Sequence, residues 1–333
     1  MSVLTTSTTG PDSVPIERQK RDFRWFHEHG LTPILALVIV VALIAVYDSR
    51  FLSANALVSL LDQSSVLGLL ALSQALVVFT GRINLANAAL ASLGGVVLAL
   101  LLPEWGWWGV LLVVAGGAAA GLIIGLVHII GQVPSFVVTL GGMGVFAGLA
   151  LWASGADSIY VASGYENLEW ITWRMFGIPI SFLLLLAISG VLMLGFGLLP
   201  LGRGIRAVGF NERAAAFSGI RTGAVVISIF ALSGALSGLA ATFQVAELQS
   251  AGATTSDALL LPALAAVLLG GNAISGGTGG IGRTLIGVLI ITVLRVGLDI
   301  VGVPSALQPV IYGVIVILTI AVTVDRSRGR AIA

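Results

Sequence analysis

Residues 107–131, WWGVLLVVAGGAAAGLIIGLVHIIG, are almost entirely apolar and contain no Asp, Glu, Lys or Arg. As a helix this stretch would be about 37 Å long, which exceeds the roughly 30 Å hydrocarbon core of a bilayer. Gly117, Gly121 and Gly125 recur at every fourth position, and this spacing lets a second helix approach one face closely. The stretch therefore predicts a closely packed transmembrane helix. The same spacing occurs at Gly144 and Gly148 and at Gly234 and Gly238.

The composition of the whole chain agrees with a membrane protein. Of 333 residues, 57% are apolar and only 9% are charged, whereas soluble domains contain about 25% charged residues. The mean hydropathy is +1.07, which also excludes a disordered chain. The absence of cysteine excludes disulfides, thiolate metal sites and a cysteine nucleophile.

Apolar runs long enough to cross a bilayer, about 20 residues each, occur ten times. The predicted fold is therefore an all-α polytopic membrane protein with about ten transmembrane helices. The third run begins with polar residues, and the eighth contains Pro262 and ends in glycines, so these two depart most from a regular span. The ten segments are 31–48, 57–80, 84–102, 107–131, 134–154, 179–199, 224–247, 258–274, 280–300 and 305–324.

The positions of basic residues predict the orientation, since Lys and Arg favour cytosolic loops. With both termini inside, thirteen of the sixteen Lys and Arg residues are cytosolic. This gives a polar cytosolic tail at 1–30, which lacks the features of a secretory signal, a permease domain at 31–324, and a second cytosolic tail at 325–333. The thirteen are Arg18, Lys20, Arg21, Arg24, Arg82, Arg203, Arg206, Arg213, Arg221, Arg283, Arg326, Arg328 and Arg330.

Two loops are long enough to have a role of their own. The outer loop, 155–178, contains Tyr160, Tyr165, Trp170, Trp173 and Phe176. These aromatic residues form either a belt at headgroup level or a platform for an extracytoplasmic partner.

The inner loop, 200–223, contains a short predicted helix over 211–218. Asn211 is a suitable N-cap, Glu212 favours the positive end of the helix dipole, and Gly219 is a suitable stop. Phe217 would be an exposed apolar side chain on this helix. The alternative is an ordinary basic loop that only satisfies the charge rule.

Polar residues within spans usually face a helix bundle or a water-filled pathway. Gln74, Asn84, Asn87 and His128 fit this description. Asn84 and Asn87 are three residues apart, so on a helix they would share one face. Neutral donors and acceptors favour a neutral polyol over an ion. The alternative is that these residues are hydrogen-bonding groups between helices.

Sequence signatures of catalysis were not found. The chain lacks a P-loop, and the glycine-rich run 276–282 is followed by no lysine. The three histidines form no metal-ligand pattern, and no nucleophile–base pair is recognisable, so we expect no catalytic residue and no metal site.

Three stretches resemble the permeases of ribose-, xylose- and galactose-type ABC importers, a monosaccharide family. AVGFNERAAAFSGI (207–220) is similar to the segment that forms the coupling helix of that family. VPSFVVTLGGMGVFAGLAL (133–151) and AAVLLGGNAISGGTGGIGRTLIGVLI (265–290) are similar to two further segments. The resemblance implies ATPase contacts at Gly209, Asn211, Glu212, Arg213, Ala214, Ala215, Phe217, Ser218 and Gly219. It also adds Phe136 and Thr139 to the substrate-pathway candidates.

The resemblance also implies a type II-like permease fold and a set of partners. Two permease subunits would form the pathway in a bacterial inner membrane, in contact with lipid. A sugar-binding protein would deliver substrate outside, and a tandem-cassette ATPase would bind ATP and Mg inside, so this chain itself would hold no cofactor and no nucleic acid.

The chain departs from the family pattern near the expected pathway. GRINLANA (81–88) has Asn84 where the family usually has an acidic residue, and His128 stands where the family commonly has Asn. These changes leave nucleosides, furanoside signals or branched-chain amino acids as alternative substrates, and permit an unequal half of a heterodimer. A secondary transporter or a purely structural subunit are the alternatives outside this class.

Overall fold

The computed structural model describes residues 31–323 and is predominantly helical. The two predicted tails, 1–30 and 325–333, lie outside the described residues. Seven helices are long and apolar enough to cross a membrane. They are α3 (Ala54–Val78), α4 (Asn87–Trp105), α5 (Trp107–Ile130), α6 (Ser135–Ser154), α8 (Ile180–Leu198), α11 (Thr222–Leu248) and α13 (Ile281–Val301). Three shorter apolar helices are α2 (Leu31–Tyr47), α12 (Leu260–Leu269) and α14 (Gln308–Thr323).

Each of the ten predicted segments overlaps one of these helices, but the eighth helix is much shorter than predicted. α12 has 10 residues, or about 15 Å, which is about half of the hydrocarbon core. The helix ends because Gly270 caps it and Gly271 takes a left-handed conformation with φ +81°. The chain then continues as an irregular loop to Gly280, so 258–274 is not a continuous helical span.

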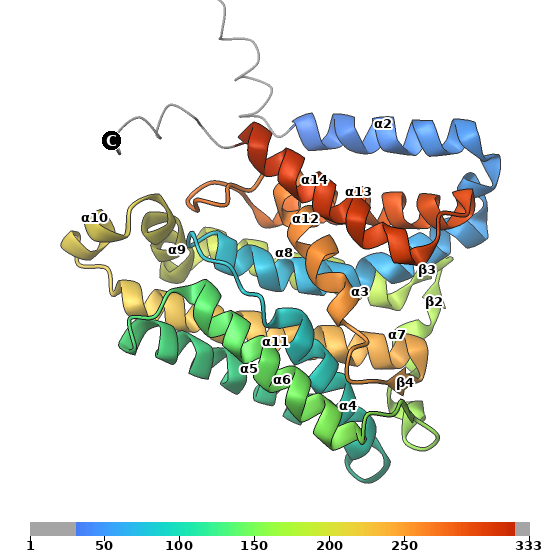
Figure 1. Cartoon of the computed structure of the whole chain (residues 1–333), viewed down its shortest axis with the longest axis horizontal. Coiled ribbons are helices and arrows are strands. Elements are labelled where there is room, and N and C mark those ends of the chain that lie inside the picture. The colour runs from blue at the N-terminus through green and yellow to red at the C-terminus, as the bar shows by residue number, and fades with distance from the viewer. Residues whose placement is uncertain (1–30, 324–333) are drawn as a thin grey trace, which may run out of the picture.

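α11 lies at the centre of the bundle and packs on α3, α4 and α5. Figure 1 shows α3 and α11 between α2, α13 and α14 on one side and α5 and α6 on the other. The glycine spacing explains the closest of these contacts. A Cβ added at Gly121 would lie 2.0 Å from the carbonyl oxygen of Phe230, and one at Gly234 would lie 2.0 Å from that of Gly117. The predicted close packing is therefore confirmed for α5 and α11.

Gly144 and Gly148 of α6 are also spaced four residues apart, but they do not pack closely against another helix of the described chain. A Cβ at Gly144 or Gly148 would meet no atom within 4 Å, so close packing of this stripe within the chain was a wrong prediction. Large side chains on α6, such as Val145 and Trp152, are also exposed. This helix presents an unpartnered apolar face.

α4 begins at Asn87, three residues later than the predicted span. The preceding segment, 82–86, is irregular because the Asn84 side chain accepts a hydrogen bond from the Ala86 N–H at 3.0 Å, a local bond that competes with helix formation. Asn84 is thus outside the helix, and the prediction that Asn84 and Asn87 share a helix face was wrong.

Short elements occupy the two ends of the bundle. α9 (Pro200–Phe210) and α10 (Glu212–Phe217) lie at one end, and α7 (Glu169–Thr172) and the strands lie at the other (Figure 1). The strands form two antiparallel pairs, in which Ile159 is opposite Ala251 and Arg174 is opposite Pro179. The remaining elements are η1 (Ser49–Leu52), β1 (Ile159–Tyr160), η2 (Tyr165–Asn167), β2 (Arg174–Met175), β3 (Ile178–Pro179), β4 (Ser250–Ala251), η3 (Asp257–Leu259) and η4 (Ser305–Leu307).

The aromatic residues of the loop 155–178 divide into two groups. The Tyr165 hydroxyl donates to the Ala246 carbonyl at 2.9 Å, and the Trp170 ring lies 5.6 Å from that of Trp107. These contacts fix the loop on the bundle. Tyr160, Trp173 and Phe176 are exposed, so only these three remain available for a belt or a partner.

Candidate functional site

The predicted helix in the inner loop is confirmed. α10 has Asn211 as its N-cap, whose side-chain oxygen accepts a hydrogen bond from the Ala214 N–H at 3.0 Å. The Ser218 hydroxyl donates to the Ala214 carbonyl at 3.0 Å, and Gly219 ends the turn with φ +82°. A residue with a Cβ rarely adopts this φ, so glycine is needed at that position.

α10 presents a distinct surface to its surroundings. Phe217 is 94% exposed, whereas Ala215 on the opposite face is only 4% exposed and anchors the helix. Arg213 and Ala214 are exposed beside Phe217. An exposed aromatic flanked by a basic residue on a capped helix is a suitable anchor for a partner protein.

Arg82 connects α10 to the bundle. Its Nη2 donates to both carboxylate oxygens of Glu212, at 2.9 Å each, and its Nε donates to His128 Nε2 at 2.7 Å. His128 Nδ1 then donates to the Val133 carbonyl at 2.6 Å, because the neutral ring carries its proton on the nitrogen opposite the accepting one. The Arg82 Nη1 donates to the Thr80 carbonyl at 2.9 Å. We call these five residues the Arg82 cluster.

The sequence did not reveal the Arg82 cluster. It assigned Glu212 to the helix dipole and His128 to the substrate pathway, whereas the structure joins both to Arg82 at the end of the bundle that carries α10. The three residues belong to three different segments, and nothing in a single sequence pairs them.

A second connection to α10 is made by backbone contact. A Cβ at Gly209 would lie 2.1 Å from the Phe79 carbonyl oxygen and 2.4 Å from the Gly277 nitrogen. The Gly277 N–H donates to the Phe79 carbonyl at 3.0 Å. A Cβ at Gly276 would lie 2.5 Å from the Gly81 nitrogen. Glycines thus bring α9, the end of α3 and the loop 270–280 into direct contact.

Polar side chains gather in the interior between α3, α4 and α11. The Asn84 amide donates to the Ser233 hydroxyl at 3.0 Å, and the Ser73 hydroxyl lies 2.8 Å from that of Ser233 and 3.2 Å from that of Ser237. The Asn87 amide donates to the Leu70 carbonyl at 3.3 Å, one turn of α3 before Gln74. The interior polar cluster therefore comprises Ser73, Gln74, Asn84, Asn87, Ser233 and Ser237.

Three atoms of the interior polar cluster lack a partner in the described part of the chain. They are both side-chain amide atoms of Gln74, which is 1% exposed, and Oδ1 of Asn87. An unpaired buried polar group costs about 1–3 kcal/mol. These atoms are therefore suited to bind water or the hydroxyl groups of a ligand.

The remaining pathway candidates occupy different places. The Thr139 hydroxyl lies 3.4 Å from the Ile83 carbonyl, next to Asn84, and is buried. Phe136 is 55% exposed on the unpartnered face of α6. The structure therefore places Thr139 beside the interior polar cluster, Phe136 on an open face, and His128 in the Arg82 cluster.

The bundle consists of apolar helices with a neutral polar interior, and an exposed, capped helix is joined to one end. This combination is typical of membrane permeases. Comparison with known proteins agrees: the chain belongs to the permease family described as branched-chain amino acid transport system / permease component, which matches residues 56–320. It is a multi-pass protein of the inner membrane.

Relatives extend over almost the whole chain. The ribose import permease protein of Bacillus subtilis strain 168 is 35% identical over 90% of this chain and 93% of its own length. The Escherichia coli K12 ribose import permease protein is 33% identical over 89% and 93%. The autoinducer 2 import system permease protein of Escherichia coli SMS-3-5 is 29% identical over 90% and 92%. No solved structure matches this chain significantly. The predicted resemblance to monosaccharide importer permeases is confirmed.

Proposed function

We propose that this chain is the permease subunit of an ATP-driven importer and forms the pathway for a sugar or a sugar-like neutral polyol. The observation that carries the proposal is the pairing of Glu212, at the start of the exposed helix α10, with Arg82, which lies in the segment leading to α4 and the interior polar cluster. The names of the relatives, ribose and autoinducer 2 import permeases, support the substrate class.

The interior polar cluster favours a neutral substrate. Its side chains are amides and hydroxyls, which match the donors and acceptors of a polyol. A branched-chain amino acid carries two formal charges, and burial of a charge without a charged partner is costly. The furanoside-type signal therefore remains the nearest alternative, since it also presents hydroxyl groups.

The proposed topology has ten membrane segments with both termini in the cytosol, α12 entering as a half-length segment. It is supported by Arg82, Arg206, Arg213 and Arg283, which belong to the segments at the end of the bundle that carries α10. Single cysteines at Ser163 and Ser218, both exposed in the structure, should be labelled from opposite sides of the membrane by an impermeant reagent. The native chain contains no cysteine, so labelling of both positions from one side would contradict this topology.

In the proposed mechanism, a tandem-cassette ATPase that binds ATP and Mg docks on α10. Displacement of α9 and α10 would reach the bundle through the glycine contacts at Gly209 and through the Arg82 cluster. Arg82 precedes Asn84 by two residues, and the Asn84 side-chain amide donates to the Ser233 hydroxyl. A displacement of Arg82 would therefore move the segment that contacts α11. Only a few residue contacts therefore separate α10 from the interior polar cluster.

The other partners are assigned to the remaining exposed surfaces. The unpartnered face of α6, which includes Phe136, is proposed to meet the second permease subunit along the pathway. Tyr160, Trp173 and Phe176, at the opposite end from α10, are proposed to lie near the docked sugar-binding protein.

The test of the docking role is Phe217→Ala in the full-length chain, co-expressed with the ATPase of the same transporter. Loss of a central aromatic anchor typically costs 2 kcal/mol or more, so we expect loss of ATPase co-purification and of substrate-stimulated hydrolysis. Tyr47→Ala is the matched control, because Tyr47 is also an exposed aromatic but lies on α2. Co-purification of the Phe217→Ala chain at the level of the control would mean that the ATPase docks elsewhere.

A further inference from the structure

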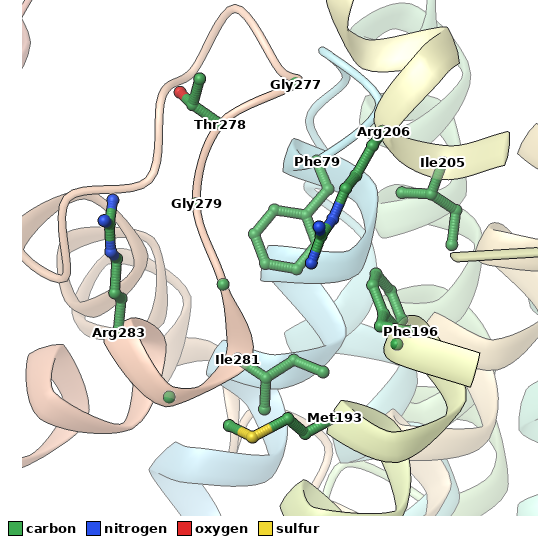
Figure 2. Close-up of a pocket in the computed structure, with 13 residues that line it drawn as sticks. Phe79, Met193, Phe196, Ile205, Arg206, Gly277, Thr278, Gly279, Ile281 and Arg283 are labelled. Atoms are coloured by element: carbon green, nitrogen blue, oxygen red, sulfur yellow. The ribbon is translucent and has the colours of Figure 1, made fainter. Parts of the chain in front are cut away.

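A cavity of about 400 Å³ lies between the end of α8, α9, the glycine loop and the first turn of α13. Figure 2 shows its residues. One wall is aromatic: the rings of Phe79 and Phe196 meet edge to face with centroids 5.7 Å apart. The cavity is at the same end of the bundle as α10, and it is separate from the interior polar cluster.

The polar part of the cavity is positively charged. Arg206 of α9 and Arg283 of α13 both line it, and no acidic residue does. Figure 2 shows Arg206 reaching into the space beside Phe79 and Phe196, with Arg283 on the other side of the loop segment that carries Gly279. Within residues 31–323, no carboxylate lies within ion-pair distance of Arg206.

We infer that this cavity binds a phosphate-bearing anion. Arginine matches phosphate with a planar pair of donors, and basic pockets between membrane helices on the cytosolic side are suited to acidic lipid headgroups. The aromatic wall suits a ligand that continues beyond its phosphate into an apolar part. The source of the phosphate is either a phospholipid of the inner leaflet or a soluble phosphate compound.

The occupant would have a structural consequence. Arg206 lies on α9, which leads directly into α10, whereas Arg283 lies on α13. A phosphate held by Arg206 against the first turn of α13, which lines the cavity with Ile281 and Gly282, would tie the docking loop to α13. It would thereby stabilise the glycine contact between Gly209 and Gly277.

The test uses the purified full-length chain in a neutral detergent, with the midpoint of thermal unfolding as the measurement. The midpoint is followed during titration with phosphatidylglycerol, with phosphatidylcholine and with inorganic phosphate. We expect a saturable rise with an anionic phosphate ligand and none with phosphatidylcholine. Arg206→Gln should weaken the apparent affinity at least fivefold, and Arg206→Lys should weaken it less, because lysine keeps the charge but not the planar pair of donors. Arg203→Gln is the matched control, since Arg203 is exposed on the same helix and does not line the cavity.

The outcomes separate the two sources. A rise with phosphatidylglycerol alone identifies a lipid headgroup, and a rise with inorganic phosphate as well identifies the phosphate group as sufficient; both support the site. Arg206→Met, which keeps the length of the side chain without its charge, should weaken binding in the same direction and serves if Arg206→Gln does not fold. The inference is overturned if neither anion stabilises the chain, or if Arg203→Gln weakens binding as much as Arg206→Gln. Transport and ATPase docking do not enter this measurement, so its failure leaves the proposed function untouched.

Discussion

The Arg82 cluster and the interior polar cluster are both built from polar groups near α4, yet they differ in how completely those groups are paired. Arg82 makes four hydrogen bonds, to Glu212, His128 and Thr80. Gln74, by contrast, has no side-chain partner among the described residues. A fully paired network holds one geometry, whereas an unpaired buried group favours a site that a water or ligand completes. The first region is therefore suited to transmit a displacement and the second to bind a substrate.

The largest loss of transport is expected from a substitution at the contact between α9 and the end of α3. Gly209→Ala would place a Cβ 2.1 Å from the Phe79 carbonyl oxygen, so α9 must move away. We expect transport to fall more than tenfold and the thermal midpoint to drop, since overpacking typically costs 1–3 kcal/mol. Gly190→Ala on α8 is the control, because a Cβ there meets nothing within 4 Å. Equal behaviour of the two variants would mean that this contact is not needed.

Arg82→Gln should have the next largest effect. It removes the ion pair with Glu212 and leaves His128 without its donor. We expect the ATPase still to co-purify, because Phe217 and the N-cap at Asn211 are intact, while substrate-stimulated hydrolysis falls about tenfold. The test is to measure ATPase co-purification and substrate-stimulated hydrolysis in vesicles for the same variant. Loss of co-purification together with hydrolysis would make Arg82 a folding residue of α10 rather than a transmitting one.

Asn87→Leu tests the interior polar cluster. In contrast to Gly209→Ala, it should impair transport without lowering the thermal midpoint. Leucine has the same number of side-chain heavy atoms but no unpaired oxygen, so the thermal midpoint should stay equal or rise, because an unpaired buried group costs about 1–3 kcal/mol. Transport should nevertheless fall several-fold, with ATPase association unchanged. Asn55→Leu, at an exposed position of α3, is the control. If uptake by Asn87→Leu equals that of the control, Asn87 is only a packing residue.

The smallest effect is expected at Arg213. This side chain is exposed at the edge of α10, and charge pairs at the rim of an interface contribute little and are screened by salt. Arg213→Gln should weaken ATPase association two- to threefold at low ionic strength and not measurably at high ionic strength. A salt-independent loss of tenfold or more would place Arg213 at the centre of the interface.

Local features of the sequence predicted most of the fold. Hydropathy located a helix in each predicted segment, and the pattern from Asn211 to Gly219 located α10, because capping and burial depend on neighbours in the chain. The glycine spacing predicted the contact of α5 with α11 but not the open face of α6, since both faces have the same pattern. Pro262 and the terminal glycines marked the α12 run as irregular, but its length was overestimated because hydropathy does not show that the helix ends at Gly270 and Gly271.

The candidate site was predicted less completely. Phe217 and the neutral polar residues were found because each is unusual for its surroundings. The pairing of Arg82 with Glu212 and His128 was not found, since the residues are separated by 130 and 46 positions. Only the folded arrangement of three segments brings them together.

In the proposed mechanism, Glu212 and Arg82 act as one unit between the docking helix and the bundle. A double-mutant cycle of Arg82→Gln and Glu212→Gln, read out as substrate-stimulated ATP hydrolysis in vesicles, tests it most directly, because residues that act together show non-additive losses. We expect the double variant to be no more impaired than Arg82→Gln alone. Losses that multiply, so that the double variant falls by the product of the two single effects, would contradict it.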